Sequence, residues 1–109
     1  MSDFSKSERR VLRDLAGHVY EAEAGRLLGE LEASFKEWRA GEKLSSDLLQ
    51  DIHQFHQHGS RELWSMYQSL KEQEIVARGI ALGLIPEAKL EPALLEKLRT
   101  RIEDFKNEG

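Results

Sequence analysis

The stretch that decides the fold runs from Ser5 to Ala40, SKSERRVLRDLAGHVYEAEAGRLLGELEASFKEWRA. Residues four apart lie nearly above one another on an α-helix, because each residue turns the chain by about 100°. One such row is apolar at every position except one: Leu15, Val19, Glu23, Leu27, Leu31 and Phe35. A strand would need strict alternation of apolar and polar residues, and this stretch has none. The pattern therefore predicts one long helix.

Both ends of this helix carry a sequence signal. Ser5 and Glu8 have the spacing of a capping box, in which the two side chains accept hydrogen bonds from backbone amides of the first turn. Gly41 follows the last apolar residue and suits the left-handed conformation in which many helices end. We therefore expect a first helix over about 5–40.

Shorter amphipathic segments fill the rest of the chain. The spacing predicts a helix over about 46–58, a helix over about 60–84, and a last helix over about 92–106 that begins at Pro92. Gly59 and Ser60 either break the path between the first two or kink it, so these segments form two separate helices or one bent helix. The apolar face of the segment 46–58 is predicted to contain Leu48, Leu49, Ile52, Phe55 and His56.

The short turn near residue 43 makes the first helix and the broken second arm antiparallel neighbours. The predicted fold is all-α: a long antiparallel helical hairpin with a short C-terminal helix, in one domain over 1–109. Its amphipathic stripes are longer than one short helix can cover, so we expect a homodimer or another protein partner.

Composition narrows the function classes. The net charge of −4 argues against a protein that grips nucleic acid by bulk charge, and the cluster Arg9, Arg10 and Arg13 is diluted by acidic neighbours. There is no cysteine, no apolar signal segment and no run long enough to span a bilayer. These features predict a soluble cytoplasmic protein.

Three polar residues interrupt apolar rows: Glu23, His56 and Glu74. In the predicted hairpin, the residue numbers of facing positions add up to about 86. This register brings Glu74 near Arg9 and Arg13, which predicts a partly buried ion pair. It also brings His56 opposite Glu30.

His53 and His56 are three residues apart on a helix, so both imidazoles could face one ion. The third ligand would be a carboxylate, either Glu23 or Glu30 of the first helix or Glu62, and the ion would be zinc, iron or nickel. The stronger patterns His-Glu-x-x-His and Glu-x-x-His are absent from the chain. A metal-binding helical bundle or small metalloenzyme is therefore the alternative hypothesis.

The leading hypothesis is a small helical interaction or regulatory module that associates with itself, because no catalytic motif occurs in the sequence. The candidate interface residues are small residues on one side of the first helix and aromatic residues on the second arm: Gly17, Gly25, Gly29, Trp64 and Tyr67.

Overall fold

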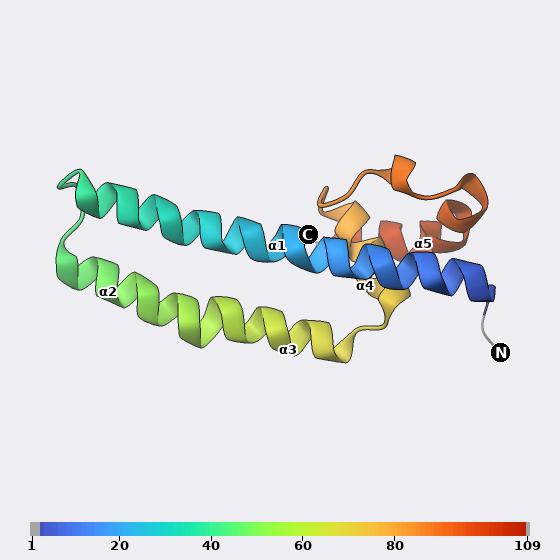
Figure 1. Cartoon of the computed structure of the whole chain (residues 1–109), viewed down its shortest axis with the longest axis horizontal. Helices are drawn as coiled ribbons and strands as arrows, with labels where there is room; N and C mark the ends of the chain where they lie inside the picture. Colours follow the sequence, from blue (N-terminus) through green and yellow to red (C-terminus); the bar gives the residue numbers. More distant parts are fainter. Residues whose placement is uncertain (1–2, 109) are drawn as a thin grey trace. The chain divides into compact units, whose positions relative to one another are not determined.

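A computed structural model describes residues 3–108, and every regular element in this range is helical. The elements are α1 (Lys6–Arg39), α2 (Ser45–Gln54), the π-helical turn η1 (Phe55–Ser60), α3 (Arg61–Ser69), α4 (Glu72–Ala81), the short 3-10 turn η2 (Glu87–Lys89) and α5 (Pro92–Glu108) (Figure 1). The predicted all-α fold with a long first helix is confirmed.

The described chain divides into two compact units. The first, which we call the bundle, contains residues 3–22 and 70–108; the second, which we call the hairpin, is Glu23–Ser69. Helix α1 contributes its N-terminal half to the bundle and its C-terminal half to the hairpin. The prediction of a single domain concerns cooperative unfolding and stays a prediction.

The bundle starts with the predicted capping box. The Ser5 amide donates to Glu8 Oε1 at 2.9 Å, and the Glu8 amide donates to Ser5 Oγ at 3.1 Å. These two bonds satisfy donors that the first turn of a helix leaves free. The same Glu8 carboxylate accepts from Lys97 Nζ of α5 at 2.7 Å, so the cap also ties the two helices together.

The bundle core is built from the first turns of α1 packed with α4 and α5. Its buried apolar side chains are Phe4, Leu12, Leu15, Ala16, Val19, Ile75, Val76, Ala77, Ile80, Ile85, Leu90, Leu94, Leu98 and Ile102. Gly79 lets α4 approach α1 closely: a Cβ on this residue would lie 2.5 Å from Val19 Cγ2. Glycine is therefore required here for the space it leaves, and the core is tightly packed at this crossing.

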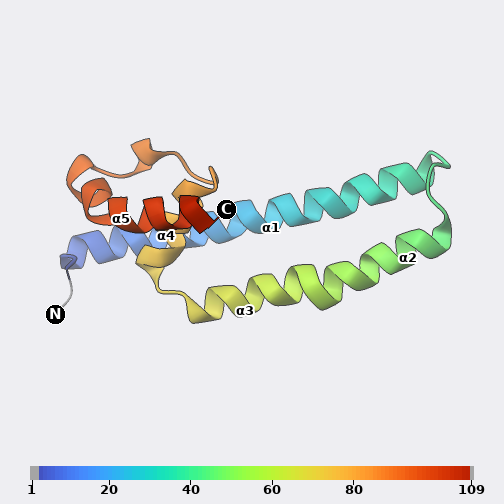
Figure 2. The same ribbon diagram turned by 180° about the vertical axis from the view of Figure 1, so that it is seen from behind.

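The hairpin turns back at Gly41, whose φ of 80° is the left-handed conformation that the sequence predicts. Trp38 Nε1 donates to Ser45 Oγ at 2.9 Å and joins the two sides of the turn. The second arm, made of α2, η1 and α3, then runs antiparallel beside the C-terminal half of α1, as the view from behind also shows (Figure 2).

At Gly59 and Ser60 the structure has the second of the two predicted alternatives, a continuous helical path. The π-helical turn η1 joins α2 to α3 from Phe55 to Ser60. Such turns insert extra backbone into a helix without ending it. Gly59 fits this turn because a Cβ would already lie 3.1 Å from Leu27 Cδ1 on α1.

The real interruption falls at Leu70 and Lys71, inside the helix predicted over 60–84. Ser69 Oγ donates to the Met66 carbonyl at 2.8 Å at the end of α3, and Glu74 Oε1 accepts from the Lys71 amide at 3.2 Å at the start of α4. Glu74 is thus a capping residue. The apolar spacing continues across this point, which is why the pattern alone predicts one helix.

Candidate functional site

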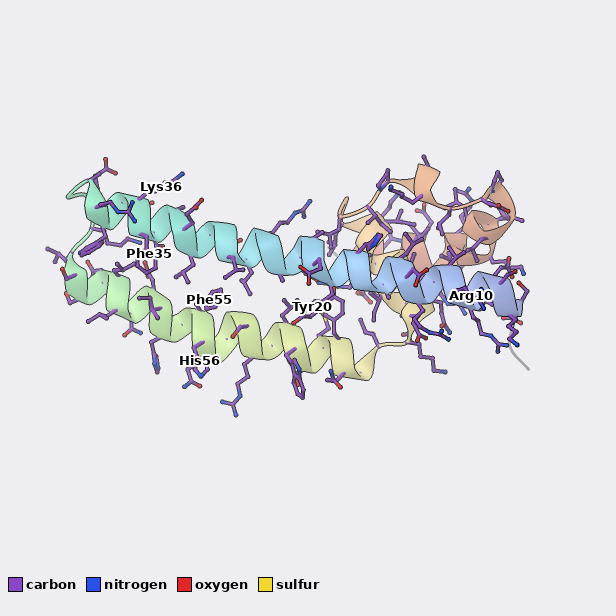
Figure 3. All side chains as sticks on the ribbon, viewed as in Figure 1. Arg10, Tyr20, Phe35, Lys36, Phe55 and His56 are labelled. Carbon is purple, nitrogen blue, oxygen red and sulfur yellow. The ribbon has the colours of Figure 1, made fainter. Side chains whose placement is uncertain are left out.

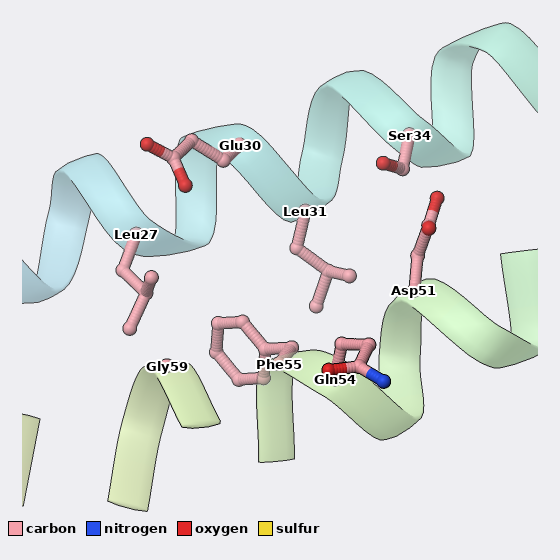
Figure 4. A pocket seen from close by; sticks show the side chains of 8 residues that line it. All are labelled: Leu27, Glu30, Leu31, Ser34, Asp51, Gln54, Phe55 and Gly59. Carbon is pink, nitrogen blue, oxygen red and sulfur yellow. The ribbon is translucent and has the colours of Figure 1, made fainter. Parts of the chain in front are cut away.

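The hairpin contains a shallow groove between α1 and the second arm, with a volume of about 270 Å³. Figure 4 shows its lining residues, which are Leu27, Glu30, Leu31, Ser34, Asp51, Gln54, Phe55 and Gly59. Leucine and phenylalanine side chains make its floor, and polar side chains make its rim. The pairs Leu27–Gly59 and Leu31–Phe55 match the predicted hairpin register.

A lysine from the turn organises one end of the groove. Lys43 Nζ forms an ion pair with Asp51, lies 3.3 Å from Glu37 Oε2 and donates to Ser34 Oγ at 3.3 Å. The hydrogen bond between Lys43 and Asp51 lowers the pKa of the Asp51 carboxyl and raises the pKa of the Lys43 ammonium. Asp51 is therefore ionised at neutral pH, and its carboxylate is already paired with Lys43.

This arrangement fastens the turn to both helices. Lys43 pairs with two carboxylates, and Ser34 and Gln54 are the uncharged polar side chains that line the groove. Ser34 also hydrogen-bonds to Asp51, which helps to keep the pKa of the Asp51 carboxyl below its ordinary value. The groove's chemistry is that of a clamp that holds the hairpin closed.

The predicted metal ligands lie apart in the hairpin. Glu23 accepts a hydrogen bond from the Tyr67 hydroxyl at 2.7 Å, while His53 and His56 are exposed. Figure 3 shows His56 pointing away from α1 and Phe55, its neighbour, pointing toward it. His56 therefore does not belong to the inward face to which the sequence analysis assigns it.

Across residues 3–108, no group of three or more His, Asp or Glu side chains is placed to hold a metal ion. Glu30 lines the groove on α1, whereas His53 and His56 are exposed on the second arm. Zinc, iron or nickel binding by Glu23, Glu30, His53 and His56 stays a prediction.

The structure gives Glu74 a different partner from the predicted one. Its carboxylate caps α4 through the Lys71 amide, and the structure contains no ion pair between Glu74 and either Arg9 or Arg13 in the described range. Both arginines are exposed on α1. The physical reason is local: a helix N-terminus three residues before a glutamate competes well for its carboxylate.

The candidate interface residues fall into two groups. Gly17, Gly25 and Gly29 are exposed, and a Cβ on any of them would meet no atom within 4 Å. Trp64 is exposed as well, whereas Tyr67 is half-buried against Glu23. The glycines therefore serve no close approach inside the described chain.

The most marked property of the hairpin is its lack of burial. Of its apolar side chains, only Leu48 and Leu63 are buried, while five large ones are exposed: Leu28, Trp38, Leu44, Leu49 and Trp64. Leu49 is exposed although the sequence assigns it to the inward face with Leu48. One neighbouring helix covers only a narrow stripe of α2, and Leu49 lies about 100° from Leu48.

Comparison with known proteins adds no relative. No protein-family model matches the chain, no curated protein matches it, and no solved structure matches it. No helix in the described part of the chain is both long enough and apolar enough to cross a membrane. The function is therefore inferred from the geometry of the two units alone.

Proposed function

We propose that this chain is a small helical interaction module that associates with itself through its hairpin. The observation that carries the proposal is the contrast in burial between the two units. The bundle buries a contiguous core, whereas the hairpin buries two leucines and leaves five large apolar side chains open to solvent.

The physical reason is that amphipathic helices gain stability by burying their apolar sides against another layer. Two helices alone bury one stripe each. Large apolar side chains that stay exposed supply the kind of surface through which proteins associate. The lack of cysteine accords with a protein that works in a reducing cytoplasm.

Sedimentation equilibrium over roughly 1 to 100 µM tests the proposal, a range that covers the micromolar affinities of modest interfaces. Self-association predicts a mass that rises with concentration above the chain mass of 12.5 kDa. The chain mass at every concentration would contradict it.

A further inference from the structure

The two broad sides of the hairpin differ in chemistry, and three short segments of its sequence show how. Each segment places a charged residue, an inward leucine and an apolar residue in a row: Arg26-Leu27-Leu28, Asp47-Leu48-Leu49 and Glu62-Leu63-Trp64. The central leucines point to the interior, since Leu48 and Leu63 are buried and Leu27 contacts Gly59. The third residues are 56%, 68% and 61% exposed, in that order.

Helix geometry places all three exposed residues on one side of the hairpin. Each follows an inward residue and therefore lies about 100° further around a right-handed helix. The two arms run in opposite directions and face each other, so the same rotation from the facing direction leads to the same broad side. Leu28 of α1 thus shares this side with Leu49 of α2 and Trp64 of α3. We call it the apolar side.

The charged residues that precede the inward leucines lie about 100° in the other sense, on the opposite broad side. The groove belongs to this charged side, since Glu30 and Asp51 directly precede the inward-facing Leu31 and Ile52. On the second arm, the positions at helical spacing between Leu49 and Trp64 are His53, His56 and Ser60. The apolar side of this arm therefore has no carboxylate, lysine or arginine between its two large residues.

We infer that the apolar side binds the same side of a second copy of this chain, so that two hairpins form a four-helix bundle. This inference rests on the proposed self-association and names the surface that carries it. On α1 the same side also carries Glu32 and Lys36, which follow Leu31 and Phe35 and form an ion pair with each other at 3.8 Å. Exposed leucine and tryptophan side chains are typical of interface cores. Because the charges of Glu32 and Lys36 cancel, this side also avoids part of the repulsion that two copies, each of net charge −4, would otherwise meet at their contact.

The size of the apolar side fits a dimer. The hairpin's part of α1, Glu23 to Arg39, is roughly 25 Å long at 1.5 Å per residue, and two helices side by side are roughly 20 Å wide. The footprint is about 500 Å² per copy, so two copies together reach the ~1,000 Å² that a specific interface needs. Stacked face to face, each helix would gain a second neighbour, as in antiparallel four-helix bundles.

The test is sedimentation equilibrium of the full chain and of variants with substitutions at exposed positions. Leu49→Glu should weaken the dimer at least tenfold, because a two-fold interface would bury the new carboxylate twice. Leu49→Glu combined with Trp64→Glu should leave a monomer at all concentrations. Gln54→Glu, on the charged side of the same arm, is the matched control and should dimerise like the parent chain.

A second readout follows the interface directly through tryptophan fluorescence. With Trp38→Phe, the remaining indole is Trp64, which is exposed in a single copy. Its emission should shift to shorter wavelength as concentration rises through the dimerisation range, and Gln54→Glu should not change this shift. Far-UV circular dichroism of each variant checks that the helices remain formed.

The outcomes separate this inference from the proposed function. If the parent chain is a monomer throughout, both are overturned. If the parent chain and the double variant with Leu49→Glu and Trp64→Glu dimerise equally well, the interface is not on the apolar side, and self-association stands. In that case Gly25→Leu tests the exposed glycine side of α1, and loss of the dimer there would identify the alternative surface.

Discussion

The bundle and the hairpin share one helix but are stabilised in different ways. Of the sixteen buried apolar side chains in the described range, fourteen belong to the bundle and two to the hairpin. The bundle closes its core with three helices, since α4 and α5 cover the first turns of α1. The hairpin has only two helices and depends on polar ties such as the Lys43 clamp and the Tyr67–Glu23 bond. Whether apolar side chains are buried or exposed is therefore decided by the presence of a third packed helix, and not by helix propensity.

The largest expected effect is a cavity in the bundle. Leu98 is completely buried, so Leu98→Ala should lower the free energy of unfolding by about 2–5 kcal/mol. Urea unfolding followed by circular dichroism measures the change. Leu82→Ala, at an exposed leucine of the same unit, is the control and should change the midpoint little. Equal losses at the two positions would contradict the assigned core.

The next effect tests the close crossing of α1 and α4. Gly79→Ala would place a methyl group 2.5 Å from Val19 Cγ2, and Val19 is a β-branched residue with little freedom to move. We expect a loss of about 1–3 kcal/mol from overpacking. Gly17→Ala, where a Cβ meets nothing within 4 Å, should instead stabilise the helix by up to about 1 kcal/mol. If both substitutions changed the free energy of unfolding in the same direction, this packing would be wrong.

A smaller effect is expected from the polar tie inside the hairpin. Tyr67→Phe removes the 2.7 Å hydrogen bond to Glu23 and should destabilise the hairpin by about 1 kcal/mol, because both groups are only half-buried. Hydrogen exchange of hairpin amides should speed up accordingly, while bundle amides keep their rates. Unchanged hairpin exchange would mean that this bond does not hold the arms together.

The smallest effect is a pH dependence with one origin in each unit. Hydrogen bonding to Lys97 lowers the pKa of Glu8 below its ordinary 4.5, and hydrogen bonding to Lys43 lowers the pKa of Asp51 below 3.8. A carboxyl with a lowered folded-state pKa stabilises the fold above its unfolded pKa, and this contribution is lost as the pH falls through the folded value. The bundle should therefore lose protection below about pH 4.5, and the hairpin below about pH 3.8.

Single substitutions assign that dependence. Glu8→Gln should reduce the loss of hydrogen-exchange protection that bundle amides show at low pH, and it should leave the loss in hairpin amides unchanged. Asp51→Asn should do the reverse. Hydrogen exchange at several pH values provides the measurement. A response in the wrong unit would show that the two ion pairs are not local to their units.

Much of this architecture is predictable because its signals are local. The Ser5–Glu8 cap, the left-handed Gly41 and the start of the last helix at Pro92 follow from short-range chemistry. The hairpin register is also predictable, since a short turn fixes which residues face each other, and Leu27 meets Gly59 as that register requires.

The interruption at Leu70 and Lys71 is not predictable from apolar periodicity, which runs through it without a change of phase. The signal lies in Glu72 and Glu74, acidic residues placed as in the first turn of a new helix. The same signal explains why Glu74 caps α4 and does not pair with arginine.

The candidate site depends on which side of each helix stays open, and that depends on the number of neighbours. An amphipathic pattern predicts Leu48 and Leu49 together on one apolar face, but a single neighbouring helix buries only Leu48. The repeated order of charged, inward and apolar residues at 26–28, 47–49 and 62–64 is visible in the sequence. This pattern can be interpreted only once the hairpin shows that the central residue of each segment points inward.

The most direct test of this account is hydrogen exchange of the parent chain at roughly 1 µM and 100 µM, concentrations on either side of a micromolar dissociation constant. We expect bundle amides to be protected equally at both concentrations, and amides of α2 and α3 to exchange more slowly at the higher one. Equal protection of the hairpin amides at both concentrations, with a mass of one chain, would contradict this expectation, because the hairpin would then gain no second layer.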